Sequence, residues 1–567
     1  MNASNSGNTT TPAETPVLIV GGGPVGLALA LDLGWRNIPC VLIEQGDGEV
    51  VDAKMFTTGI RSVEFCRRWG IAEKVKHWGF PEDYPFDNVF VTSLDGHELG
   101  RIPMPAFRDI PPFAVSPEGY AHCPQFVFDP ILAAEVQKYP GVTLRYHTRL
   151  VSFCDEGEGV VAEIVNDKTG QRWEIRAQYL VGCDGVGSTV RKQLGFGMHG
   201  AGMINHSFNV MFRAPALWEH HDKGKAGRYV IVGDEGAWAS LTPADGKDLW
   251  RLMIHGDLDT DPASVDPAHE LRRAIGADTP FEIVKFGHWI RRHLVADRYA
   301  RGRVLLAGDA VHVMPPNGGL GMNTGLGDSV DLGWKLAAVH QEWGGVHLLE
   351  SYEAERRPVG IRQCDEAMEN FTRYGSRKPV PHVTDETPEG ARVRAELGKR
   401  LSSANSQAWE NPMNTHLGYR YEGSPIVVAD GPLPPEPEDS RLYTQTSHPG
   451  CRAPHAWLAD GRSTLDLFGR QFTLLRFPGA PPSVALVAAA ARRGVPLDVV
   501  ELASPQIAGL YERRLVLVRP DGHVAWRGDT LPPDALALID RVRGAVAPLP
   551  IGGGQKPETV GAGAGSA

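Results

Sequence analysis

The sequence lacks three features: long apolar runs, paired cysteines and an excess of basic residues. No apolar stretch approaches the roughly 20 residues that a membrane span needs, so no membrane partner is expected. The seven cysteines are scattered without a CxxC or a Cys/His cluster. This excludes a disulfide framework and indicates no metal site. With 57 basic and 68 acidic side chains the net charge is -11, which argues against nucleic acid as a partner.

Length and the two ends bound the organisation of the chain. A chain of 567 residues is too long for one hydrophobic core, so two or three domains are expected. Residues 1–15 are polar, with neither a basic nor an apolar signal region. They are predicted to be a disordered leader, and a cytoplasmic location is expected. The glycine-rich residues 549–567 are predicted to be a disordered tail.

A dinucleotide-binding motif opens the first regular region. "VLIV" predicts a strand, "GGGPVG" a turn, "LALALDLGW" a helix, and "PCVLIE" a second strand that ends at Glu44. In the pattern G-x-G-x-x-G the glycines allow a tight turn, close approach of a pyrophosphate and helix–strand packing, while the acid accepts from a ribose. An isolated motif of this kind also fits an ordinary glycine turn, but the complete strand-turn-helix-strand-acid order favours a dinucleotide. The motif residues are Gly21, Gly23, Pro24, Val25 and Gly26.

Two later strands also run into Asp/Gly turns. "QYLVGCDGVGSTVRKQLG" contains Asp184, and "GRVLLAGDAVH" contains Asp309. The simplest interpretation is a turn aspartate for the first and a helix cap for the second. Residues 308–328 then hold six glycines and two prolines, and are predicted to form a long loop before a helix over 327–343. A loop held by regular elements at both ends is not a domain linker.

These pieces, in this order, resemble the single-component (class A) FAD-dependent aromatic hydroxylases, in the phenol hydroxylase and polyketide hydroxylase branch. The resemblance rests on the glycine motif with Glu44, the "CDG" turn, "GD...PPNGGLGMN" and the later "LLESYEAERRPVG". It covers about 15–370. Residues from about 440 to 545 are similar to the family's thioredoxin-like appendage, but without a CxxC. This appendage is interpreted as structural, with homodimer formation as its candidate role.

The resemblance implies an α/β fold with a Rossmann-like FAD-binding domain, an interleaved mixed β-sheet substrate domain and a C-terminal thioredoxin-like domain. It implies FAD as cofactor, NADPH or NADH as a transient reductant, O2 as co-substrate, and hydroxylation of a small phenolic or related aromatic substrate through a flavin hydroperoxide. The predicted boundaries are 16–200 with 285–372 (FAD), strands inserted near 80–120, 201–284 (substrate), 373–440 (connection) and 441–548 (thioredoxin-like).

Residue by residue, the resemblance implies that the glycine motif holds the pyrophosphate, Glu44 the adenosine ribose and Asp309 the ribityl chain. Asp184 is tied to FAD phosphate and pyridine nucleotide, and Gln125 lies near the flavin chain. Gly321, Met322 and Asn323 present backbone N–H groups to the pyrimidine edge of the flavin, where a reduced flavin is negative and a helix N-terminus supplies positive partial charge. The remaining implied cofactor residues are Lys54, Pro316 and Gly319.

The substrate side departs from the family. Lys54 stands where the family has an arginine, so it keeps the charge but loses the bidentate fork. Phe56 replaces a polar residue that faces the substrate in phenol hydroxylases. Met253 falls near a relative's active-site tyrosine, and Pro315 stiffens the loop between substrate and flavin. Arg251 is the catalytic candidate, holding a phenolate or carboxylate; an exposed strand arginine is the alternative.

Two other functions stay open. The same fold supports a polyketide-tailoring oxygenase that performs epoxidation or Baeyer–Villiger insertion. In another class, the chain would be an FAD-binding reductase or a ligand-binding paralogue without oxygenation. No second G-x-G-x-x-G follows a predicted strand, so NAD(P)H has no Rossmann site of its own. No W-x-W occurs among the thirteen tryptophans, which disfavours the related halogenases.

Overall fold

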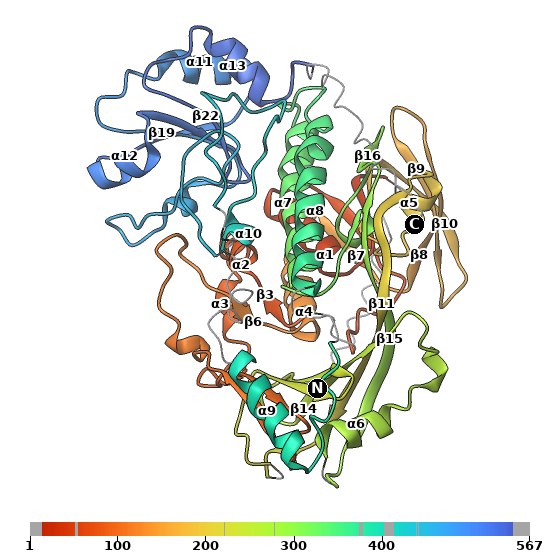
Figure 1. Ribbon diagram of the computed structural model, residues 1–567. Helices are drawn as coiled ribbons and strands as arrows, with labels where there is room; N and C mark the ends of the chain where they lie inside the picture. Colours follow the sequence, from red (N-terminus) through yellow and green to blue (C-terminus); the bar gives the residue numbers. More distant parts are fainter. Residues whose placement is uncertain are drawn as a thin grey trace, which may run out of the picture.

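A computed structural model of the protein describes residues 14–51, 55–219, 221–276, 278–372, 378–401, 413–437, 439 and 441–547. Four β-sheets, of eight, eight, four and two strands, make up this part of the chain together with their helices (Figure 1). The predicted α/β fold class, with its Rossmann-like, substrate and thioredoxin-like domains, is confirmed. Within the described ranges, no helix combines the length and the apolar character that crossing a bilayer requires.

The first sheet contains β1 (Glu14–Val20), β2 (Cys40–Ile43), β7 (Val142–Arg145), β8 (Thr148–Asp155), β9 (Val160–Asn166), β10 (Arg172–Gly182), β16 (Ala300–Arg301) and β17 (Val304–Leu306). Five strands run parallel in the order β17-β10-β1-β2-β7, and β16, β9 and β8 add antiparallel pairs. The strands β2 and β17 are wholly buried, as expected for parallel strands covered on both faces.

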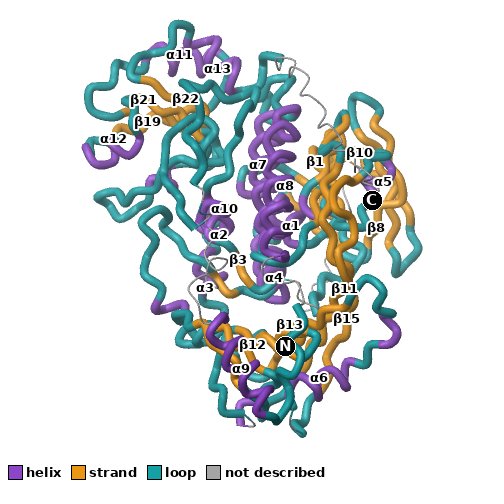
Figure 2. Tube along the Cα trace, viewed as in Figure 1, coloured by secondary structure: helices purple, strands orange, loops and turns teal. Residues whose placement is uncertain are grey.

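The helices of this domain are α1 (Pro24–Trp35), α2 (Ile60–Arg68), α3 (Ala72–Lys76), α4 (Gln125–Val136), α5 (Thr189–Gln193), α7 (Leu320–His340) and α8 (Glu350–Asn370). Figure 2 shows α7 and α8 standing between the first sheet and the C-terminal domain. Side chains of α7 enter the cores on both sides: Leu326 and Val330 join the first domain, and Trp334 joins the C-terminal domain.

The glycine-rich stretch is not a loop throughout its length, which corrects the prediction for 308–328. Helix α7 begins at Leu320, seven residues before the predicted start. The helical glycines are explained by close packing on α1. A β-carbon on Gly325 would lie 2.5 Å from Val25 Cγ2, and one on Gly333 would lie 2.1 Å from Asp32 Oδ2. Tertiary contact therefore outweighs the roughly 1 kcal/mol that each glycine costs a helix.

The second sheet contains β4 (Asn88–Val91), β5 (Glu98–Ile102), β11 (Met198–Arg213), β12 (Arg228–Gly233), β13 (Gly236–Pro243), β14 (Leu249–Gly256), β15 (Glu282–Ala296) and β18 (His312–Val313), with α6 (Pro267–Ile275) packed on it. Its order is β18-β15-β11-β14-β13-β12-β4-β5, antiparallel except for β12 beside β4. Phe208, Val210 and Phe212 of β11 enter the α6 core. Because side chains alternate along a strand, the residues between them face the other side.

The predicted connection 373–440 contains a helix that the sequence analysis did not identify. Helix α9 (Pro388–Leu401) packs Val393, Leu397 and Leu401 on Leu99 and Val232 of the second sheet. The short helix α10 (Met413–Leu417) follows. The connection thus covers part of the second sheet.

A two-stranded ladder of β3 (Thr57–Thr58) and β6 (Ala121–His122) lies beside α2 and α3.

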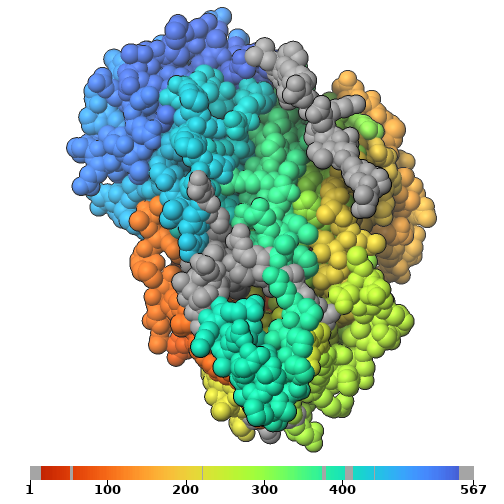
Figure 3. Space-filling model, viewed as in Figure 1, coloured from red at the N-terminus to blue at the C-terminus, as the bar shows by residue number. Residues whose placement is uncertain are grey.

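The C-terminal domain has a four-stranded sheet in the order β20-β19-β21-β22. Its elements are β19 (Phe472–Arg476), α11 (Val484–Arg492), β20 (Leu497–Glu501), α12 (Pro505–Tyr511), β21 (Leu515–Val518), β22 (Val524–Gly528) and α13 (Ala535–Val542). The predicted hairpin turns at Asp521 and Gly522, where Gly522 has a φ of +88°. In the space-filling view this domain and the central helices form one continuous surface (Figure 3).

Candidate functional site

A cavity of about 1440 Å3 lies where the two larger sheets meet. The turn after β1, the stretch from Val313 to Asn323 and the free face of the second sheet form its walls. Gly21, Gly26, Glu44 and Asp184 lie outside its lining, and Lys54 lies outside the described residues. The predicted residues that line it are Gly23, Pro24, Val25, Phe56, Gln125, Arg251, Met253, Asp309, Pro315, Pro316, Gly319, Gly321, Met322 and Asn323.

The glycines of the turn after β1 have two different roles: some allow close packing, and one leaves space for a ligand. Gly21 has a φ of +107°, and a β-carbon there would lie 2.4 Å from the Cys183 carbonyl oxygen. A β-carbon on Gly26 would lie 2.0 Å from the Gly21 oxygen. Gly23 differs, because no atom of the described residues lies within 4 Å of the position that its β-carbon would take. The first and third glycines therefore allow close packing, whereas the second leaves open space at the N-terminus of α1.

Glu44 fixes the backbone beside this turn. It follows β2, and its Oε2 accepts from the Gly22 N–H at 2.7 Å, while Oε1 accepts from the Gly46 N–H at 2.6 Å. Its role toward the ribose stays a prediction.

Asp184 organises the turn after β10. Oδ2 accepts from the N–H groups of Thr189 (2.6 Å) and Val190 (3.1 Å), and Oδ1 accepts from Ser188 Oγ at 2.5 Å. The carboxylate thus satisfies donors at the start of α5. This fits the simpler turn interpretation, and its role toward FAD phosphate stays a prediction.

The N-terminus of α7 presents backbone donors to the cavity. Its cap is Gly319, with a φ of +66°, and no side chain caps it. The first four N–H groups of a helix have no partner inside the helix and carry positive partial charge. The Asn323 side chain serves a different purpose, since its Oδ1 accepts from the Gly59 N–H (2.8 Å) and Ser62 Oγ (2.6 Å). It ties α7 to the start of α2. Asp309 does not cap α7 and its exposed side chain lies on the cavity lining.

Asp328 holds the Gly308–Asp309 turn and was not identified from the sequence. Its Oδ2 accepts from the Gly308 N–H at 3.1 Å and lies 2.8 Å from His312 Nε2, and its Oδ1 accepts from Arg356 Nε at 2.8 Å. Although burial opposes ionisation, the charges of Arg356 and His312 lower the pKa of Asp328. His312 of β18, the Gly308–Asp309 turn and Arg356 of α8 therefore all contact one buried carboxylate.

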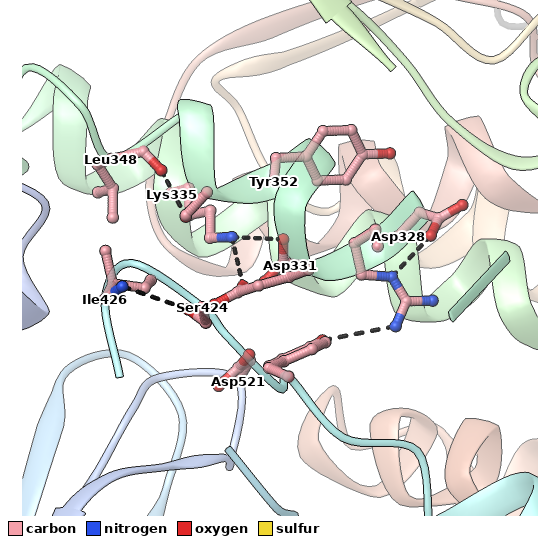
Figure 4. Close-up of polar contacts among 12 residues, drawn as sticks. Asp328, Asp331, Lys335, Leu348, Tyr352, Ser424, Ile426 and Asp521 are labelled. Atoms are coloured by element: carbon pink, nitrogen blue, oxygen red, sulfur yellow. Dashed lines mark hydrogen bonds and ion pairs between the residues drawn. The ribbon is translucent and has the colours of Figure 1, made fainter. Parts of the chain in front are cut away.

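A buried ion network joins α7 and α8 to the C-terminal domain, and Figure 4 shows the part of it around Lys335 and Asp331. Lys335 Nζ lies 2.7 Å from both Asp331 Oδ2 and Glu355 Oε2. Arg519, from the turn after β21, reaches Glu355 at 2.5 Å and Asp331 at 3.1 Å. Burial would raise the pKa of Glu355, but Arg519 and Lys335 bring it to about 2. Breaking such a buried pair typically costs 3–5 kcal/mol, so this network fixes the C-terminal domain on the helix that lines the cavity.

Gln125 begins α4 and lines the cavity, as its predicted place near the flavin chain requires. Its Nε2 donates to Asp129 Oδ2 at 3.0 Å. Asp129 is 4% exposed, and burial raises its pKa to about 7. This carboxyl is therefore protonated in part near neutral pH.

The substrate side is the free face of the second sheet. Met253 pairs with Asn209 on β11 and with Ser240 on β13, so the three side chains share this face. Arg251 is two residues away on the same face and is 8% exposed, which corrects the alternative of an exposed strand arginine. Its guanidinium carbon lies 4.1 Å from the ring centroid of Phe56, as expected for a cation–π contact.

Aromatic residues from 56–122 close one end of the cavity, and sequence analysis found only Phe56. His122 contacts the rings of Phe80 and Phe86. Burial lowers the pKa of His122 to about 3, so the imidazole stays neutral. Tyr120 also lines the cavity, and burial keeps the pKa of its hydroxyl well above the ordinary value. The run of aromatic residues in "HWGFPEDYPFDNVF" was the available signal.

The residues present fit a flat dinucleotide cofactor. Gly23 leaves open space at one helix N-terminus, the backbone donors of α7 lie at another, and Asp309 lies on the same cavity lining. Such donors suit a pyrophosphate and the electron-rich edge of a reduced flavin. No cluster of His, Cys, Asp or Glu able to hold a metal ion occurs in the described ranges.

Comparison with known families decides the assignment. Residues 14–367 match an FAD-binding domain family, and residues 446–545 match the C-terminal domain of aromatic-ring hydroxylases. The chain belongs to the FAD-dependent aromatic hydroxylases. This aromatic hydroxylase is a flavoprotein monooxygenase that uses FAD, NAD(P)H and O2, as its sequence predicts.

Known relatives of this aromatic hydroxylase match nearly its full length. It is 34% identical to tetracenomycin B2 monooxygenase-dioxygenase of Streptomyces olivaceus, over 93% of this chain and 98% of the relative. It is 30% identical to phenol 2-monooxygenase of Pseudomonas sp., over 97% and 95%. Among solved structures, RebC, a rebeccamycin biosynthetic enzyme with reduced flavin, matches with a TM-score of 0.87 and 41% identity, over 94% of this chain and 100% of RebC.

Proposed function

We propose that this aromatic hydroxylase acts on a substrate of several fused or linked aromatic rings. The observation that carries the proposal is the cavity volume of about 1440 Å3. Pockets for drug-sized ligands typically measure about 300–1,000 Å3, so this space accommodates a flavin ring together with a ligand larger than one phenol. Two solved relatives support this size: RebC was soaked with chromopyrrolic acid, and aklavinone-11 hydroxylase was solved with aklavinone at a TM-score of 0.78 and 30% identity.

The chain's own groups bind and orient the cofactor. Gly23 would leave room for the FAD pyrophosphate, the Asp309 carboxylate would accept from the ribityl hydroxyls, and the N–H groups at the start of α7 would face the pyrimidine edge. Bound FAD, once reduced by NAD(P)H, supplies the oxygen-activating chemistry. The positive end of α7 stabilises negative charge on the reduced ring. Pro315 and Pro316 keep the intervening segment stiff.

The substrate lies between the Pro315 segment and the free face of the second sheet. Phe56, Met253 and the neutral His122 supply a surface that excludes water from the reacting ring. The Arg251 guanidinium, held over Phe56, orients a phenolic oxygen and stabilises its anionic form. Because the pKa of His122 is about 3, this imidazole serves as a hydrogen-bonding group and does not take up the phenolic proton at neutral pH.

Substrate-stimulated NAD(P)H oxidation tests the proposal. The purified holoenzyme is mixed with hydroxylated naphthalenes, anthraquinones and carbazoles, and with phenol and 4-hydroxybenzoate as single-ring controls. We expect the multi-ring compounds to stimulate NAD(P)H consumption and to gain one oxygen atom by mass spectrometry. Stimulation by the single-ring compounds alone would refute the size argument. Comparison of NADH with NADPH identifies the reductant in the same assay.

We also infer a cytoplasmic homodimer that binds no nucleic acid. The net charge of -11 supports the last point. Support for a dimer comes from exposed apolar side chains on the C-terminal domain: Val484 and Val487 on α11 are 73% and 40% exposed, and Val499 on the edge strand β20 is 39% exposed. Light scattering on the purified chain, with Val484→Lys as the disrupting variant, measures the assembly. Cell fractionation measures the location.

A further inference from the structure

Arg291 of β15 is a buried cation on the lining of the cavity. Its residue is 1% exposed, yet it forms part of the cavity wall. In the register of the sheet Arg291 pairs with Asn205 of β11, and Trp289 pairs with Ser207 of the same strand. Arg291 and Trp289 are two residues apart on one strand and so share a face. Arg291 Nη2 contacts Met253 Sδ at 3.6 Å, which places the guanidinium beside a residue of the substrate wall.

This guanidinium has no counter-ion among the described residues. Within the described part of the chain its Nε and Nη1 are buried without a hydrogen-bond partner, and the thioether of Met253, a weak acceptor, is the contact of Nη2. The nearby indole Nε1 of Trp289 is likewise a buried donor to which no described residue offers an acceptor. Burial lowers the pKa of Arg291 to about 10, so the side chain stays charged at neutral pH. A buried charge without a counter-ion destabilises the folded protein unless an anion pairs with it.

Two aromatic rings hold the guanidinium in place. Its central carbon lies 5.7 Å from the ring centroid of Trp289 and 5.7 Å from that of Phe371. Cation–π contacts at buried sites are favourable, but they offset only part of the cost of burying a charge. The rings thus hold a planar fork of N–H donors beside Met253, and such a fork matches the two oxygens of a carboxylate.

We propose that Arg291, with the indole N–H of Trp289, binds a carboxylate on the aromatic substrate, so that the enzyme prefers polycyclic aromatic acids. This inference rests on the proposed function and deepens it. Arg251 remains the residue that faces the phenolic oxygen; Arg291 recognises a second, acidic group. The location favours the substrate over the FAD phosphates as the anion, because Arg291 lies on the substrate sheet, whereas the glycine turn belongs to the first sheet.

The test uses two ring systems that differ by one carboxylate, 3-hydroxy-2-naphthoate and 2-naphthol. Binding to the holoenzyme is followed by the perturbation of flavin absorbance. We expect the wild type to bind the acid at least tenfold more tightly than 2-naphthol. Arg291→Met should weaken acid binding by about 10- to 100-fold and leave 2-naphthol unchanged. Arg291→Lys, which keeps the charge but loses the fork, should fall between them.

Three controls separate recognition from structure. Lys285→Met removes a charge from an exposed position on the same strand and should behave as wild type. The Tm of Arg291→Met should equal or exceed that of wild type, because an uncompensated buried charge is removed. Its flavin content and its KM for NAD(P)H should not change. A lower Tm, loss of flavin or a raised KM for NAD(P)H would assign Arg291 to folding, to FAD or to the reductant, and would overturn the proposal.

The two proposals can fail separately. If both naphthalene probes bind equally well and are both hydroxylated, the preference for acids is refuted while the proposed function stands. If neither probe perturbs the flavin spectrum, carboxylate recognition on a fused ring is refuted. If Arg291→Met keeps the wild-type preference for the acid, Arg291 is not its binding residue.

Discussion

Gly23→Ala and Gly26→Ala should impair this enzyme for different reasons, although both residues belong to one motif: the first should weaken FAD binding and the second should destabilise the fold. At Gly23 the φ is -73°, and the space for a β-carbon is open to 4 Å. At Gly26 the new β-carbon would lie 2.0 Å from a backbone oxygen. Gly23→Ala therefore places a methyl group in the space that we assign to the FAD pyrophosphate, whereas Gly26→Ala forces α1 away from its own strand.

The expected magnitudes follow from these contacts. Gly23→Ala changes an N-cap residue and costs the apo fold about 1 kcal/mol or less, but should raise the Kd for FAD at least tenfold, or about 1.4 kcal/mol. For Gly26→Ala, overpacking against backbone costs about 3 kcal/mol, and the better helix propensity of alanine returns about 1 kcal/mol. The net loss of about 2 kcal/mol should lower the Tm of the apo protein by about 4–8 °C.

Thermal unfolding of both variants with and without FAD measures the contrast. For Gly23→Ala we expect a Tm near the wild-type value without FAD, together with a smaller rise in Tm when FAD is added. For Gly26→Ala the Tm should already be lower without FAD. Retention of wild-type FAD affinity by Gly23→Ala would show that the pyrophosphate does not approach this residue. A wild-type Tm for Gly26→Ala would refute the packing argument.

Three further perturbations test other parts of the site. Asp328→Asn leaves the buried Arg356 without its carboxylate and should cost about 3–5 kcal/mol, seen as a lower Tm; a loss below 1 kcal/mol would contradict the buried-hub assignment. Asp309→Ala should reduce flavin content sharply with little change in Tm, and unchanged flavin content would refute the ribityl assignment. Burial raises the pKa of Asp129 from 3.8 to about 7, so the folded state binds the extra proton and stability falls as pH rises between these values, by up to about 4 kcal/mol. Urea denaturation from pH 5 to 8 should show a flatter profile for Asp129→Asn, and an equally steep one would contradict the raised pKa.

Local signals were sufficient for much of the fold. The glycine motif and the Asp521–Gly522 hairpin were predictable because each is specified by adjacent residues. The start of α7 was not, because Gly325 and Gly333 disfavour a helix by themselves and are helical only through contact with Val25 and Asp32. The residues adjacent in sequence do not specify that tertiary contact.

The substrate wall shows the same limit. Arg291 and Arg292 are adjacent on β15 and both contribute to the cavity lining, but only Arg291 is buried, and the strand register decides which of the two that is. His122 and Tyr120 face the cavity because the β3–β6 ladder positions them, and that ladder has only two residues on each strand. Arg251 and Met253 could be identified because the family resemblance supplied the register that the residues alone do not.

The ion network between α7, α8 and the C-terminal domain joins charges that lie far apart in the sequence. Lys335, Asp331 and Glu355 leave the ribosome long before Arg519, the cation that completes their charges. Until then α7 and α8 together carry these two acids with one lysine, and α7 lacks its aromatic contacts with the last domain. A chain that ends before residue 519 therefore leaves this network one cation short, on the helix whose N-terminus lines the cavity.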